Sequence, residues 1–201
     1  KIDIVFIPEG YTKDEMEQFN KDCMESMESI FRHKPFGQLK DRFNFIAVEM
    51  PSEHSGVSVP KNNDWKCTAV GSHFDTFYSE RYLTTSNIKK LYDILDGIPC
   101  ESIVILANTN EYGGGGIYNN YMLSASRGPG YKSVIVHEFG HSFAGLADEY
   151  FYDDQYVTIY PAGIEPWEQN LTTLTDFGSK WRDMLPKGTE IPTVADGKDR
   201  Y

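Results

Sequence analysis

Two histidines and a glutamate stand close together in the segment His137-Glu138-Phe139-Gly140-His141. On an α-helix, residues four positions apart lie on one face, so both imidazoles can reach one metal ion. Glu138 lies one step round the helix, beside the place where a metal-activated water would be held. The spacing therefore predicts a helix that carries two zinc ligands, His137 and His141, and a general base, Glu138.

A catalytic zinc site has three protein ligands and one open position, so a third ligand is needed. Asp148 follows His141 by seven residues, which along a continuous helix is a rise of about 10.5 Å. Because a zinc–oxygen bond is about 2 Å long, the chain must turn back after His141, and Gly145 can end the helix there. We expect Asp148 to be the third ligand and Glu149 to be the competing candidate. The one that does not bind the metal is expected to orient a ligating histidine.

The apolar patterns before this segment alternate between strand and helix types and predict an α/β fold. We expect a single domain over residues 1–201, with a long ordered loop at 50–80 and an irregular part after the metal helix. The predicted strands are residues 2–7, 43–49, 102–107 and 117–124. The predicted helices run from Thr12 to before Pro35, over 86–95, over 132–144, and, as a short helix, over 175–185.

Composition and charge exclude several classes of protein. The net charge of −11 disfavours binding to nucleic acid and to anionic membranes. No apolar run is long enough to span a bilayer, and the 14% aromatic content argues against disorder. The three cysteines, an odd number without a CxxC pair, exclude a disulfide scaffold, and we expect buried free thiols.

The glycine run Gly113–Gly116 lacks the Lys-Ser/Thr pair of a phosphate-binding loop, so we expect a flexible hairpin loop. The alternative is that it forms a mobile rim of the cleft beside the metal helix. Residues 117–124, which follow it, are predicted to be an edge strand that lines the cleft. An extended substrate would add to this strand through main-chain hydrogen bonds.

The segments HEFGHSFAGLADEY, NTNEYGGGGIYNNYMLSAS and FYSERYLTT together resemble the IgA-peptidase-like family of zinc metallopeptidases. The similarity extends from IPEGYT to PWEQNLTTL, which is most of the chain. The family is related to the metzincins, whose pattern is HExxHxxGxxH or the same with Asp last. This sequence differs because Gly145 follows His141 by four residues, although Gly-x-x-Asp is kept.

The resemblance implies a zincin-like layered fold, with a mixed twisted sheet, an edge strand over the zinc cleft and an active-site helix. It also implies a secreted, cell-surface or periplasmic protein that acts on a protein or peptide substrate, with immunoglobulin as one possible class. Metzincins have a methionine turn beneath the zinc. Met184 is the one methionine after the motif, and we expect it to be a packing residue. Both ends of the sequence suggest a part of a longer secreted chain.

Two functions are compatible with these observations. The first is a zinc-dependent endopeptidase, in which Zn²⁺ on His137, His141 and Asp148 activates a water and Glu138 is the general base and acid. The alternative is a non-catalytic binding or structural module that retains a zincin fold. The intact Glu138 favours the enzyme. The run Tyr150-Phe151-Tyr152 offers a phenol that could stabilise an oxyanion.

Overall fold

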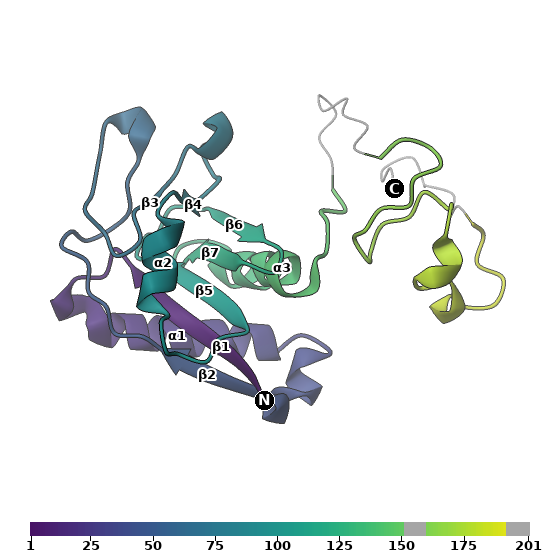
Figure 1. Ribbon diagram of the computed structural model, residues 1–201, viewed down its shortest axis with the longest axis horizontal. Helices are drawn as coiled ribbons and strands as arrows, with labels where there is room; N and C mark the ends of the chain where they lie inside the picture. The colour runs from purple at the N-terminus through teal and green to yellow at the C-terminus, as the bar shows by residue number, and fades with distance from the viewer. Residues whose placement is uncertain (151–159, 192–201) are drawn as a thin grey trace. The chain divides into compact units, whose positions relative to one another are not determined.

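The computed structural model describes residues 1–150 and 160–191 of the chain. The chain divides into two compact units, Lys1–Ala144 and Gly145–Tyr201. The first unit holds all the α-helices and β-strands labelled in Figure 1. The described part of the second unit is irregular, as predicted. In place of the expected helix at 175–185 it contains two short 3-10 turns, Phe177–Ser179 and Arg182–Met184.

The first unit is built on a five-stranded mixed sheet with the strand order β2-β1-β5-β7-β6. The first four strands in this order run parallel, and β6 is antiparallel to β7. Every residue of β5 is buried, which matches the unbroken apolar run that predicted it. These observations confirm the α/β class and the mixed sheet. The strand bounds are β1 (Ile2–Glu9), β2 (Phe43–Ala47), β5 (Ser102–Ala107), β6 (Gly114–Ile117) and β7 (Tyr121–Ala125).

Helices cover both faces of this sheet (Figure 1). On one face, α1 (Met16–Phe31) and α3 (Tyr131–Ala144) bury apolar side chains against alternate residues of the central strands, and Phe139 shares a cluster with Phe6. On the other face, α2 (Ile88–Ile94) places Leu91 in a second cluster with Val5. The predicted helices at the start, middle and motif of the chain are therefore present. In the described ranges, no helix combines the length and apolar character needed to cross a membrane.

The segment 117–124 is a hairpin rather than one strand. β6 ends at Ile117, the chain turns through Asn119, which has a left-handed φ of 54°, and β7 starts at Tyr121. β7 pairs with β5 on one side and with β6 on the other. The prediction of an edge strand at 117–124 is therefore wrong. The edge strand at this end of the sheet is β6, and it contains most of the glycine run.

Glu9 anchors the long loop at residues 50–80 to the sheet. Its side chain is fully buried at the end of β1, and its carboxylate accepts three hydrogen bonds from the loop. The donors are Thr68 Oγ1 at 2.5 Å, the Val70 N–H at 2.8 Å and the Ser72 N–H at 2.6 Å. The loop is therefore ordered, as expected, and it leads into the small antiparallel pair of β3 (Ser72–His73) and β4 (Thr84–Thr85).

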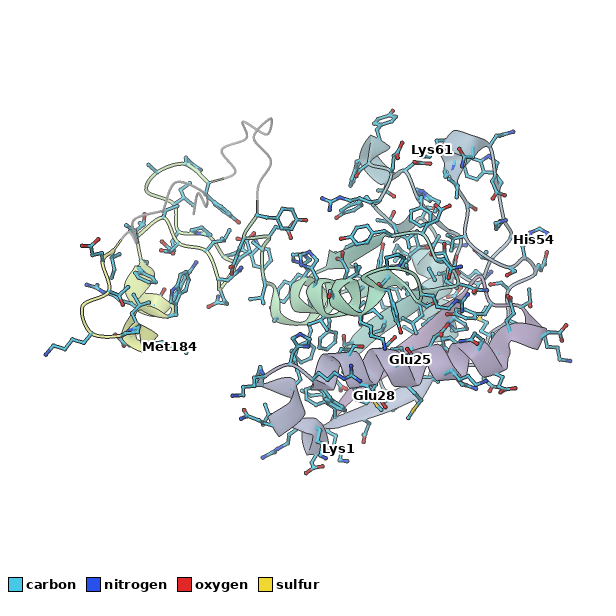
Figure 2. The ribbon with its side chains drawn as sticks, turned by 180° about the vertical axis from the view of Figure 1, so that it is seen from behind. Lys1, Glu25, Glu28, His54, Lys61 and Met184 are labelled. Atoms are coloured by element: carbon cyan, nitrogen blue, oxygen red, sulfur yellow. The ribbon has the colours of Figure 1, made fainter. Side chains whose placement is uncertain are left out.

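Two smaller expectations are partly or wholly wrong. All three cysteines are free, but Cys23 alone is buried and Cys67 is exposed. Met184, labelled in Figure 2, has an exposed fraction of 82%, so it is not a packing residue.

Candidate metal centre

The motif in α3 is anchored by its central phenylalanine. Phe139 is fully buried, and its ring lies 4.8 Å from the ring of Phe143 and 5.3 Å from that of Phe36, between centroids. Because a helix turns by about 100° per residue, Phe139 points almost opposite to His137 and His141. The aromatic cluster therefore fixes the rotation of α3 about its axis, and that rotation turns the two imidazoles away from the core.

The two histidine side chains converge at their Nε2 atoms, which are 2.9 Å apart. Two nitrogens bound to one tetrahedral zinc lie roughly 3.3 Å apart, so a small movement of the rings would accommodate the ion. Ligand atoms of His137, His141 and Asp148 all lie within 4.8 Å of one another. Two imidazole nitrogens and one carboxylate oxygen are a donor set that suits zinc. These residues therefore fit the metal predicted from the sequence.

The chain turns after the motif as the sequence suggested. α3 ends at Ala144, and Gly145 has a φ of 63°, in the left-handed region that glycine adopts without strain. The carboxylate of Glu149 is engaged elsewhere, because its Oε1 accepts a hydrogen bond of 2.9 Å from Asn170 Nδ2. The same amide group donates to the Ala147 carbonyl at 2.8 Å. The Glu149 carboxylate is thus bound by Asn170, and it is not part of the group formed by His137, His141 and Asp148.

Glu138 lies on the flank of α3 that faces β6. A β-carbon built on Gly114 would be 2.7 Å from Glu138 Oε1, and one built on Gly116 would be 3.2 Å from Oε2. The glycines therefore form a strand packed against the metal helix, and the expectation of a flexible hairpin loop is wrong. The contact of the run with α3 is not among the sequence predictions, and the glycine run is itself the signal for a close approach of another chain segment.

The oxyanion-stabilising tyrosine stays a prediction. Tyr150 is exposed, while Phe151 and Tyr152 lie outside the described residues.

Comparison with protein-family models matches residues 1–200 to the family described as IgA Peptidase M64. The chain belongs to this family. It is therefore a metallopeptidase, a hydrolase that acts on protein, and the family implies a bound metal. No curated protein shows significant similarity to the chain. Within the described ranges, one group of side chains could hold the metal that the M64 family implies, and it consists of His137, His141 and Asp148.

Proposed function

We propose that the chain is a zinc-dependent endopeptidase in which His137, His141 and Asp148 hold the ion and Glu138 is the general base. The observation that carries this proposal is the convergence of the two Nε2 atoms, 2.9 Å apart, with a carboxylate in the same group. Glu149 is the weaker candidate for the third ligand because Asn170 already binds its carboxylate.

Zinc in this position would lower the pKa of an attacking water and polarise the scissile carbonyl. Glu138, adjacent in sequence to a ligand but one step round the helix, accepts the proton of that water. The same carboxylic acid then donates the proton to the leaving amine. The packing of Glu138 against β6 keeps its carboxylate on the side of α3 where the substrate would approach.

The edge of β6 supports a main-chain mode of substrate binding. From Gly113 into β6, the backbone groups of successive residues point alternately towards β7 and away from it. The Gly113 carbonyl accepts a hydrogen bond from the Ala125 N–H, whereas the N–H and carbonyl of Gly114 bond on the other side, to Arg81 and Leu83. By the same alternation, the N–H and C=O of Gly116 point away from β7. An extended polypeptide pairing there would lie beside Glu138 and His141, which explains how such an enzyme could accept a chain without a deep pocket.

Immunoglobulin is our proposed substrate class, and we propose a secreted, cell-surface or periplasmic location. Both rest on the family resemblance and its description.

The experiment that tests the proposal measures zinc content and cleavage of casein and of purified IgA, with and without a zinc chelator. Glu138→Ala is expected to keep zinc while kcat falls by roughly 10²–10⁴-fold, the usual contribution of a general base. His137→Ala is the matched variant, and it is expected to lose zinc. The proposal is wrong if Glu138→Ala loses the metal as readily as His137→Ala, or if the chelator leaves cleavage unchanged.

A further inference from the structure

The glycines of the run Gly113–Gly116 face two different layers in alternation. Gly114 and Gly116 face α3, because β-carbons built there would meet atoms of Glu138. Gly113 and Gly115 face the opposite layer, where β-carbons would meet the carbonyl oxygens of Arg81, at 2.8 Å, and Leu83, at 2.6 Å. The run is therefore packed tightly on both sides, as expected when successive residues of a strand point to opposite faces.

The contact at Gly114 is of a different kind from the other three. A β-carbon at Gly113, Gly115 or Gly116 would collide with a backbone carbonyl, which cannot move without shifting a chain segment. At Gly114 the nearest atoms are all in side chains: Glu138 Oε1 at 2.7 Å, Glu138 Cγ at 2.9 Å and Val134 Cγ1 at 2.9 Å. Gly114 also lacks a positive φ. Neither backbone packing nor backbone conformation therefore requires glycine at 114.

The backbone at Gly114 is held from both sides of the strand. Its N–H donates to the Arg81 carbonyl at 3.2 Å, and its carbonyl accepts from the Leu83 N–H at 3.1 Å. On its other side, β6 is registered against β7, with Gly114 opposite Ser124. A side chain added at this position would therefore displace the side chains that it meets rather than the strand.

We propose that Gly114 is a positioning residue for Glu138: the absent side chain leaves the space in which the Glu138 carboxylate lies. The inference rests on the proposed function, in which Glu138 is the general base. An alanine at 114 would push the carboxyl oxygen outward by about 0.7 Å to restore an ordinary contact. A displacement of about 1 Å at a reacting group can cost on the order of 10²-fold in rate. The three atoms nearest to this β-carbon belong to Glu138 and Val134 and not to a histidine, so the main displacement is expected at Glu138.

The test compares Gly114→Ala with Gly113→Ala, its neighbour on the other face of the run. Gly114→Ala is expected to lower kcat by roughly 10–100-fold, with KM within about twofold and with normal zinc content. Gly113→Ala meets the Phe74 ring and the Arg81 carbonyl instead. It is expected to lower Tm while kcat per zinc-loaded, folded molecule stays within about threefold. A purely structural role for the whole run would predict the same outcome for both variants.

A second measurement covers the case in which Gly114→Ala is unstable. In the Glu138→Ala background two of the three nearest atoms, Glu138 Oε1 and Cγ, are absent, and Val134 Cγ1 remains. Adding Gly114→Ala should therefore change Tm less than it does in the wild-type chain. Equal destabilisation in both backgrounds overturns the inference. So does a Gly114→Ala enzyme with wild-type kcat, or one whose loss of activity follows a loss of zinc.

The two proposals fail separately. If Glu138→Ala remains active, the assignment of the general base is wrong and the inference falls with it. If Glu138→Ala is inactive but zinc-loaded while Gly114→Ala is fully active, the proposed function stands and the role given to Gly114 alone is wrong.

Discussion

Replacing Phe139 by alanine tests whether the core face of the motif helix determines its stability. The ring is fully buried, stacked on Phe143 and in edge contact with Phe36. Removing a buried phenylalanine ring costs about 3–5 kcal/mol, because it loses transfer energy and leaves a cavity. We expect the upper half of this range, since two aromatic contacts add about 0.5–1.5 kcal/mol each. Domains of this size unfold with about 5–15 kcal/mol, so the variant would be marginally stable.

The measurement is urea unfolding followed by far-ultraviolet circular dichroism, with zinc removed from all proteins so that metal binding does not contribute. Phe77→Ala is the control of the same residue type, since Phe77 is 86% exposed, and its cost should stay within about 0.5 kcal/mol. His137→Ala, on the exposed face of the same helix, should also cost little in the metal-free state. A Phe139→Ala cost below about 1 kcal/mol would refute the anchoring role of the ring.

Four further variants test other parts of the structure. Asp148→Ala should weaken zinc binding by at least about 100-fold in a competitive chelator titration, and Glu149→Ala by less; the reverse order would exchange their roles. Burial alone would raise the pKa of Glu165, but hydrogen bonds from a backbone N–H and from threonine and lysine side chains lower it to about 2. This depressed pKa adds stability that is complete above pH 4.5 and is lost as the pH falls towards 2. The Tm difference between wild type and Glu165→Gln should therefore shrink, and not grow, as the pH is lowered over that range. Asp22→Ala should cost about 3 kcal/mol in urea unfolding, because the buried Asp22 carboxylate pairs with Arg127 at 2.8 Å and accepts hydrogen bonds from Tyr11 and Gln18; a cost near zero would contradict this.

Local patterns were sufficient to predict the parts of the fold that depend on periodicity. The apolar run at 102–107 predicted a strand buried on both faces, and β5 is such a strand. The spacing of His137 and His141 predicted that their imidazoles share a face of one helix, and their Nε2 atoms converge. The stop at Gly145 was predicted for the same reason, since a left-handed residue ends a helix locally. Each of these features is determined by residues close together in the sequence.

The edge of the sheet could not be predicted in this way. A strand made of glycines has no alternation of side chains to detect, so the pattern predicts a loop at β6 and an edge strand at residues 117–124, most of which belongs to the turn and to β7. The reason for the glycines lies far away in the sequence, in the carbonyl of Leu83 on one face and the side chain of Glu138 on the other. The same limit applies to Glu149, whose engagement by Asn170 depends on a contact across 21 positions.

The buried carboxylate of Glu9 bears on how a peptidase survives its own activity. Proteolysis requires a stretch of substrate to leave its fold and lie extended in a cleft, so the cleavage rate of a native loop follows the free energy of its local opening. The segment at residues 50–80 has little regular secondary structure, and long loops of this kind are where proteolysis usually starts. Opening it near Val70 and Ser72 would break two of the three hydrogen bonds that the buried Glu9 carboxylate accepts from the loop. The anchor thus couples any opening of this segment to the loss of buried hydrogen bonds at the end of β1, which raises the free energy of opening and slows self-digestion there.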